Sequence, residues 1–194
     1  MKNIVKSDIT VVILAGGKSI RMNHKDKGLI LFNGKPLISY VVDIVYQDVC
    51  SILISANRNI SEYQRFGEVI TDSLPGFQGP LVGILSALNK VKTKYLLVVP
   101  CDGPFINQGL VARLLKNMQQ PGVNICVAMQ GLKMHPTFSL VSVNLKDNLS
   151  EFLEQGNRKM SVWFESNNAK KVDFSDQVNM FMNLNSPKDL KNNQ

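Results

Sequence analysis

Residues 9–22 read ITVVILAGGKSIRM, and this stretch decides the fold class. Its first six residues are apolar or β-branched, which predicts a buried strand at 9–14. Gly16 and Gly17 follow directly, and the basic residues Lys18 and Arg21 come next. A buried strand that ends in a glycine-rich turn is typical of α/β proteins, whose ligands bind beyond the carboxyl ends of the strands. We therefore expect further strands and covering helices along the chain.

Apolar, β-branched runs alternate with helical patterns over most of the sequence. Further strands are predicted at 51–55, 69–70, 95–99, 124–128 and 137–141, and helices at 36–46, 80–91, 108–118 and 145–153. This alternation is typical of a mainly parallel, twisted sheet with helices on both faces. No repeat or linker divides the chain. We predict an α/β, Rossmann-like fold of three layers that forms a single domain over residues 1–194.

The composition is that of a soluble globular protein, with 44% hydrophobic and 19% charged residues. No apolar run reaches the roughly 18 residues that span a bilayer, and the first ten residues lack the apolar core of a signal peptide. We therefore expect a cytoplasmic protein that does not bind membranes. Cys50, Cys101 and Cys126 form no CxxC pair, which argues against a structural zinc site and a disulfide framework.

A net charge of +7 favours anionic partners, which include nucleic acids, membrane surfaces and phosphorylated small molecules. The distribution of the charge separates these classes. Five basic residues crowd one short stretch in which Asp26 is the only acidic residue: Lys18, Arg21, Lys25, Lys27 and Lys35. The chain lacks aromatic residues interleaved with a basic stripe, so the charge predicts a local phosphate site and no nucleic-acid surface.

The glycine-rich turn matches neither of two common phosphate-binding motifs. A Walker A loop that ends at Gly17-Lys18-Ser19 requires glycine at position 12, which is valine, and the dinucleotide motif GxGxxG fails because position 21 is arginine. Two adjacent glycines are equally compatible with a tight turn that has no ligand. Arg21 and Lys27 favour the phosphate hypothesis, because both carry the cationic groups that bind phosphate oxygens.

A second candidate feature is Asp102, which follows the predicted strand at 95–99 in the sequence PCDGP. Alone, an aspartate before glycine and proline indicates only a turn. A carboxylate at the end of a central strand, together with a basic loop, favours a magnesium ligand in the ligand crevice. Asp72 follows the short strand at 69–70 in the same way and is a candidate for contact with a metal, a ribose or a base edge.

Motifs along nearly the whole chain are similar to those of the nucleotidyltransferase superfamily and, within it, of molybdenum cofactor guanylyltransferases. The superfamily signature corresponds here to LAGG at 14–17, RM at 21–22 and DKG at 26–28. The narrower resemblance rests on the ordered segments NGKPL at 33–37, ANR at 56–58, DS at 72–73, GPLVG at 79–83, PCD at 100–102, HPT at 135–137 and NLNSP at 183–187.

The resemblance implies transfer of GMP from GTP to the phosphate of molybdenum-molybdopterin, with Mg²⁺, and partner proteins that deliver the cofactor or mature molybdoenzymes. It implies catalytic roles for Arg21, Lys27 and Asp102, with Asp102 as the metal ligand. The implied nucleotide-binding residues are Leu14, Ala15, Gly16, Gly17, Lys27, Ser55, Asp72 and Asp102. The pterin substrate is implied to lie toward the second half of the chain, and the implied residues that bind it are Gly79, Pro80, Leu81, Arg158, Lys159, Asn183 and Asn185.

Two positions depart from the family pattern, and three other functions stay open. Asn23 replaces a usual glycine, and Ser55 stands where asparagine is common in the nucleotide pocket. The alternatives are a transferase that uses CTP on the same pterin, one that uses a sugar phosphate, and a non-catalytic anion-binding module. His24 and His135 suggest no metal site, and we expect His135 to be a loop or substrate-edge residue and not a catalytic base.

Overall fold

The computed structural model describes residues 4–16, 26–72, 79–184 and 189, and strands and helices alternate along them as predicted. The strands of the main sheet are β1 (Ile9–Leu14), β4 (Ser51–Ser55), β5 (Glu68–Ile70), β6 (Tyr95–Pro100), β7 (Ile125–Gln130), β8 (Lys133–Ser142) and β9 (Lys170–Asp173). The α-helices are α1 (Leu37–Val45), α2 (Ile60–Tyr63), α3 (Pro80–Lys90), α4 (Gly109–Met118), α5 (Lys146–Glu154) and α6 (Met160–Ser166). A hairpin of β2 (Leu31–Phe32) and β3 (Lys35–Pro36) lies apart from the sheet. The described residues also include the short 3-10 helices η1 (Lys6–Asp8), η3 (Lys27–Leu29) and η4 (Val143–Leu145).

The main sheet has seven strands in the order β5-β4-β1-β6-β8-β7-β9. Four of its neighbouring pairs are parallel, and β8 runs antiparallel to both β6 and β7. The prediction of an α/β fold with a mainly parallel sheet is confirmed. From β1 the chain first builds β4 and β5 on one side and then crosses to β6 on the other, so the strand order reverses at β1. Ligands of open α/β sheets bind at such a switch point.

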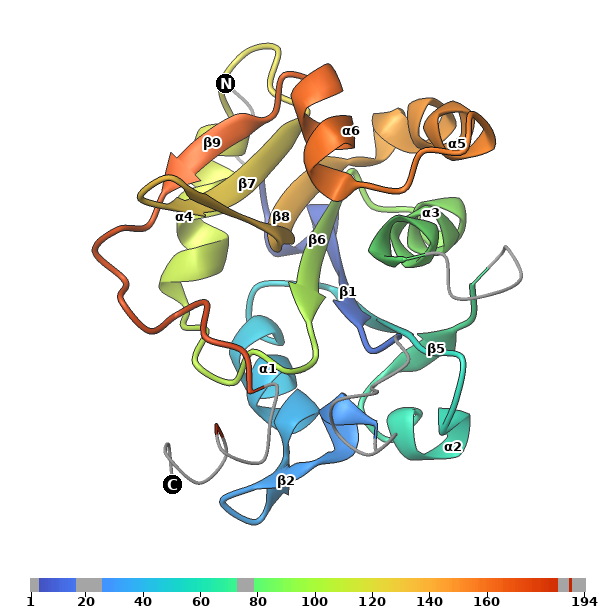
Figure 1. Ribbon diagram of the computed structural model, residues 1–194, viewed down its shortest axis with the longest axis vertical. Helices are drawn as coiled ribbons and strands as arrows, with labels where there is room; N and C mark the ends of the chain where they lie inside the picture. The colour runs from blue at the N-terminus through green and yellow to red at the C-terminus, as the bar shows by residue number, and fades with distance from the viewer. Residues whose placement is uncertain (1–3, 17–25, 73–78, 185–188, 190–194) are drawn as a thin grey trace.

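Helices cover both faces of the sheet, as Figure 1 shows. On one face α1 and α4 pack on alternate residues of the central strands, among them Val11, Ile13, Leu97 and Val99. On the other face α3, α5 and α6 pack on the intervening residues, such as Val12 and Leu96. Because side chains alternate across a strand, one apolar run supplies both cores. No helix among the described residues is long and apolar enough to cross a membrane.

Differences from the predicted elements occur in both halves of the chain, since the β2–β3 hairpin and α2 were not predicted in the first half. β8 extends over ten residues, whereas the sequence predicted five, because it pairs with both β6 and β7. α6 and β9 were not predicted. Each has at most seven residues, which is too short for a clear periodic pattern, and each depends on tertiary packing. The core on this side includes Trp163, which is fully buried and donates a hydrogen bond from Nε1 to Asn148 Oδ1 over 2.8 Å.

Helix α3 approaches the ends of β1 and β4 closely at Gly83. A Cβ atom at this position would lie 2.4 Å from Ser55 Oγ and 3.3 Å from Leu14 Cδ2. Both neighbours belong to the last residue of a strand at the switch point. Glycine therefore lets the helix pack directly against the carboxyl edge of the sheet.

We expect Gly83→Val to lower the free energy of unfolding by about 2 kcal/mol, because two branched methyl groups have no room beside Ser55. Asn89→Val is the matched control, since it adds the same β-branched side chain at an exposed position of α3 and changes stability by only a few tenths of a kcal/mol. Urea unfolding of the three proteins measures both effects. Equal stabilities of the two variants would contradict the close packing.

Candidate active site

Residues Leu14 to Gly16 run between two strands at the carboxyl edge of the sheet. Leu14 is paired with Ser55 of β4 on one side and with Pro100 of β6 on the other. The Ala15 amide donates to the Ser55 carbonyl over 2.9 Å, and the Cys101 amide donates to the Leu14 carbonyl over 3.2 Å. Gly16 is exposed. The start of the predicted glycine-rich loop is thus anchored at the switch point. Gly17 and Arg21 lie outside the described residues, as does Asn23.

Lys27 and Asp102 form an ion pair at this edge, although 75 residues separate them in the sequence. Lys27 Nζ lies 3.2 Å from Asp102 Oδ2, and the lysine side chain is 30% exposed whereas the aspartate side chain is 8% exposed. Lys27 begins η3, and Asp102 follows β6. The structure therefore brings together two of the predicted catalytic residues, with the lysine on the solvent side of the carboxylate.

Asp26 directly precedes Lys27 in the chain and was not among the predicted site residues. Its carboxylate is buried and accepts hydrogen bonds from the hydroxyl of Tyr63 and, over 3.2 Å, from Asn59 Nδ2. Burial, assisted by the negative charges nearby, raises the pKa of Tyr63 far above its usual value, so the hydroxyl remains a donor. From the sequence, only the position of Asp26 next to Lys27 could have suggested that it belongs to the site. Nothing in the sequence indicates that Tyr63 is buried against this carboxylate.

Asp72 lies just beyond β5 and is held by a reciprocal pair of hydrogen bonds. Asn57 Nδ2 donates to Asp72 Oδ2 over 2.7 Å, and the Asp72 amide donates to Asn57 Oδ1 over 2.9 Å. Because β5 and β4 are parallel neighbours, Asp72 and Ser55 both lie at the carboxyl edge of the sheet. Ser55 itself is buried, and its hydroxyl faces the α3 backbone at Gly83.

Of the residues predicted for the pterin substrate, Gly79 to Leu81 lie at the start of α3, and Asn183 lies near Gly103. Gly79 has a φ of 90° and precedes Pro80 at the start of α3, whereas Leu81 is fully buried in the core. Asn183 Oδ1 lies 3.5 Å from the position that a Cβ of Gly103 would take. The next residue, Leu184, donates its amide to the Asp102 carbonyl over 3.1 Å, so the segment around Asn183 adjoins the ion pair.

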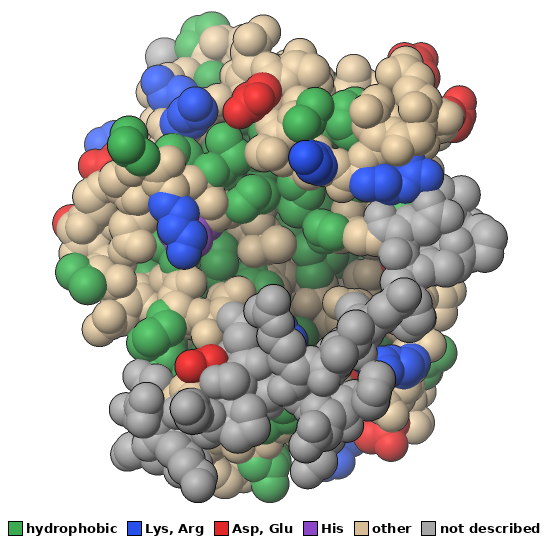
Figure 2. All heavy atoms as spheres, in the orientation of Figure 1, with side chains coloured by type: hydrophobic (Ala, Val, Ile, Leu, Met, Phe, Trp, Pro, Cys, Tyr) green, Lys and Arg blue, Asp and Glu red, His purple; other side chains and the backbone are tan. Residues whose placement is uncertain are grey.

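The two basic residues predicted to bind the pterin substrate differ in exposure: Arg158 is partly buried and Lys159 is exposed. Arg158 Nη1 donates hydrogen bonds of 2.7 Å to the carbonyls of Leu153 and Asn157. Its guanidinium therefore caps the carboxyl end of α5. Lys159 is exposed just before α6. Figure 2 shows a hollow in this face of the molecule, with hydrophobic side chains on its walls and Lys and Arg side chains around its upper rim. Asn185 lies outside the described residues.

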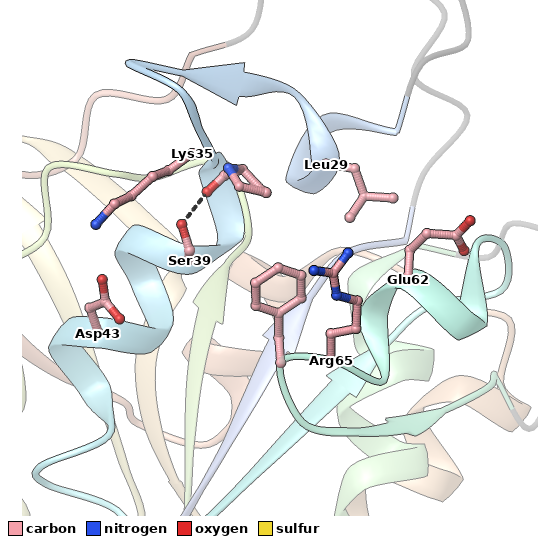
Figure 3. Close-up of a pocket in the computed structure, with 8 residues that line it drawn as sticks. Leu29, Lys35, Ser39, Asp43, Glu62 and Arg65 are labelled. Atoms are coloured by element: carbon pink, nitrogen blue, oxygen red, sulfur yellow. Dashed lines mark hydrogen bonds between the residues drawn. The ribbon is translucent and has the colours of Figure 1, made fainter.

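A separate pocket of 480 Å³ opens on the outer side of η3, between α1 and α2 (Figure 3). Its lining combines apolar and charged side chains: Leu29, Lys35, Pro36, Ser39, Asp43, Glu62, Arg65 and Phe66. None of the predicted site residues lines it. Lys35, which the sequence grouped with the basic loop, lies here. Of the two described residues of the basic cluster, Lys35 therefore lines this pocket and Lys27 does not.

His135 lies within β8 and not in a loop, which corrects the expectation from the sequence. The side chain is buried, and its ring stacks on Phe181 with the ring centroids 4.4 Å apart. Burial, and then the positive charge of Lys133, lowers the pKa of His135 below its usual value. This environment therefore disfavours the protonated imidazole, which packs against an aromatic cluster that includes Phe138 and Phe174.

Fold and site together define a class of protein: an α/β nucleotide-binding domain with a basic and acidic pair at the switch point of its sheet. Comparison with known families gives the same class, since residues 11–171 match the MobA-like NTP transferase domain. The chain belongs to this family and is a nucleotidyltransferase.

Relatives with assigned names agree with the family. The chain is 41% identical over 180 residues to a molybdenum cofactor guanylyltransferase of Shewanella sediminis, with 92% of each chain covered. It is 42% identical over 184 residues to a protein of the same name from Vibrio cholerae, covering 95% of this chain and 90% of the relative. The fold is shared with molybdopterin-guanine dinucleotide biosynthesis protein A of Archaeoglobus fulgidus, at a TM-score of 0.77, 24% identity and coverage of 94% and 95%.

We expect the neutral state of His135 to make stability depend on pH. The folded protein disfavours protonation, whereas the unfolded chain takes up a proton below about pH 6.5, so the free energy of unfolding falls as the pH drops below that value. The loss is at most about 1.4 kcal/mol per pH unit. His135→Asn removes this contribution, and His24 is common to both proteins. Urea unfolding from pH 7.5 to 5.5 measures the slopes, and equal slopes would refute the prediction.

Proposed function

We propose that this enzyme transfers GMP from GTP to the phosphate of molybdenum-molybdopterin, which gives molybdopterin guanine dinucleotide and pyrophosphate. The observation that carries the proposal is the Lys27–Asp102 pair, 3.2 Å apart, beside the anchored backbone at Leu14 to Gly16. A cation and a buried carboxylate at a switch point suit a nucleotide triphosphate with its counter-ion. The names of the relatives at about 41% identity support GTP and the molybdenum cofactor as substrates.

The chemistry needs no covalent intermediate. An oxygen of the acceptor phosphate forms a bond to the α-phosphorus of GTP, and the bond from that phosphorus to the bridging oxygen of the β-phosphate breaks. Pyrophosphate leaves with the electron pair. The acceptor oxygen is already ionised at neutral pH, so the protein contributes alignment and charge neutralisation and no general base. The Cys101 thiol, whose pKa is raised chiefly by burial and also by Asp102, stays protonated and is no nucleophile.

The nucleotide residues divide into a phosphate side and a base side. Lys27, with Arg21, neutralises charge on the leaving pyrophosphate, and the backbone at Leu14, Ala15, Gly16 and Gly17 faces the phosphates. Ser55 and Asp72 belong to the base and ribose side, where the Asp72 carboxylate is oriented by Asn57. Since the hydroxyl of Ser55 faces Gly83, we assign its contact with the nucleotide to the strand end and not to the side chain.

Asp102 fits the part of a magnesium ligand. Among the described residues no group of three or more His, Cys, Asp and Glu side chains could form a protein-only metal site. Mg²⁺ does not require one, because it is commonly bound by one or two carboxylates together with substrate phosphates and water. The ion supplies positive charge against the triphosphate when it is bound. With the ion bound, Asp102 would hold the metal, and the Lys27 ammonium would be directed at phosphate oxygens.

The acceptor side comprises Gly79, Pro80, Leu81, Arg158, Lys159, Asn183 and Asn185. Asparagine amides carry donors and acceptors, as does a pterin edge, and Asn183 adjoins Asp102 through Leu184. Arg158 donates from Nη1 to the carbonyls of Leu153 and Asn157, and its permanent positive charge suits an anionic substrate. Leu81 acts through packing, because its side chain is fully buried.

We expect pyrophosphate release from GTP and Mg²⁺ only when molybdenum-molybdopterin is present, with GTP preferred over CTP. The measurement compares the initial rates with each of the four nucleoside triphosphates, with and without the acceptor. A preference for CTP would overturn the assignment of GTP as the nucleotide, and the proposal that the pterin is the acceptor would stand. Turnover with a sugar phosphate in place of the pterin would overturn the acceptor.

Asp102→Ala separates an enzyme from a simple anion binder. An enzyme loses turnover, by on the order of 100-fold or more, because the metal and triphosphate lose their buried carboxylate. A non-catalytic phosphate binder binds GTP as tightly or more tightly once a negative charge is removed. Asp43→Ala removes an exposed carboxylate on α1 and serves as the matched control. Rates and GTP affinities of the three proteins, measured together, distinguish the two functions.

A further inference from the structure

One short segment, residues 57–63, holds carboxylates on both sides of the nucleotide site. At its start Asn57 forms two hydrogen bonds with Asp72, at 2.7 and 2.9 Å. Further along, Asn59 and Tyr63 donate to Asp26, the residue before Lys27. The segment includes α2 and lies between β4 and β5 in the sequence. It therefore contacts both the base side and the phosphate side of the site described above.

On the phosphate side the contact fixes the backbone on both flanks of Lys27. Asp26 is 8% exposed, and Tyr63 is fully buried. Gly28, the residue after Lys27, packs so closely that a Cβ there would lie 2.7 Å from Tyr63 Oη and 3.1 Å from Cys101 Cβ. The hydroxyl of Tyr63 thus anchors the residue before Lys27 and excludes a side chain from the residue after it. Lys27 itself is left with its ammonium directed at Asp102.

The hydrogen bonds to Asp26 also bear on which of two aspartates, Asp26 or Asp102, pairs with the Lys27 ammonium. An ionised carboxylate offers about four acceptor positions, and a nearby lysine competes for them. Tyr63 and Asn59 occupy positions on Asp26 that would otherwise attract the ammonium. Asn59 reaches Asp26 from a left-handed backbone conformation, with φ of 49°, which asparagine tolerates better than most residues. The geometry therefore favours Asp102 as the partner of Lys27.

We propose that residues 57–63 are a positioning element that sets the spacing between Asp72 and Lys27, and that Asp26 and Tyr63 are positioning residues for the Lys27 ammonium. The inference rests on the proposed function for the assignment of Lys27 and Asp72 to the nucleotide. Tyr63 does not touch the substrate in this account. It acts through Asp26 and η3, and Asn57 acts through Asp72.

The test compares Tyr63→Phe with the wild type and with Glu62→Gln. The phenylalanine keeps the buried ring and removes only the hydroxyl, whereas Glu62 lies on the same helix and lines the outer pocket (Figure 3). Tyr63→Phe lowers kcat/KM for GTP by about 10- to 100-fold, because misplacement of a reacting group by 1 Å has an effect of that order. The KM for the pterin acceptor stays within twofold, and Glu62→Gln stays within twofold in both constants.

A double variant distinguishes positioning from a general loss of stability. In the Lys27→Ala background, Tyr63→Phe causes no further loss of rate, because the group that it positions is absent. Its effect on the unfolding midpoint is the same in both backgrounds. A rate for Tyr63→Phe within twofold of the wild type, or a full multiplicative loss in the Lys27→Ala background, overturns the inference.

Asn57→Ala tests the base side and carries the test if Tyr63→Phe does not fold, because Asn57 is exposed. It raises the KM for GTP about tenfold with kcat within twofold, since it frees Asp72 without moving Lys27. Equilibrium binding of a fluorescent GTP analogue with Mg²⁺ separates the two proposals. If the wild type binds GTP but transfers nothing, the proposed function fails, and weaker binding by Asn57→Ala still supports the positioning element. If the wild type binds no nucleotide, both fail.

Discussion

The parallel pairing of β1 with β4 on one side and with β6 on the other places the site. Because all three strands run in the same direction, their carboxyl ends meet at one edge, and the chain that leaves each strand must turn there. Leu14 lies between Ser55 and Pro100, so the glycine-rich turn and Asp102 emerge side by side. The alternating apolar contacts of these strands with helices on both faces keep that edge rigid.

At this edge of the sheet the two carboxylates, Asp26 and Asp102, are buried, whereas the cation, Lys27, is partly exposed. Asp102 is buried against Lys27, and Asp26 is buried against neutral donors, Tyr63 and Asn59. A buried carboxylate is stabilised only when hydrogen bonds or a cation compensate for lost hydration. The two aspartates solve this requirement differently. The partner of Asp102 is a partly exposed cation, whereas the partners of Asp26 are two neutral hydrogen-bond donors.

Sequence patterns predicted the longer elements of the first half but not the β2–β3 hairpin or α2, and they predicted the second half less completely. The strand at 9–14 and the helix at 80–91 match β1 and α3 to within a residue, because long apolar patterns and a proline at the helix start define them. α6 and β9 are too short to show a period of their own. The antiparallel direction of β8 and its position between β6 and β7 depend on pairings that no local pattern specifies. The sequence also suggested that His135 is a loop or substrate-edge residue, and its pairing with Ala128 in β8 excludes the loop.

The sequence by itself determined the α/β class, the glycine-rich turn after the first strand and the presence of Lys27 and Asp102, because strand periodicity, glycine and charge are local properties. Only the tertiary structure decided that Lys27 and Asp102 meet, that Lys35 faces a different pocket, and that Asp26 is held by Tyr63. Those contacts join residues far apart in the chain. The order of the strands and the packing of α2 against η3 bring these residues together, and no single segment of the sequence specifies either.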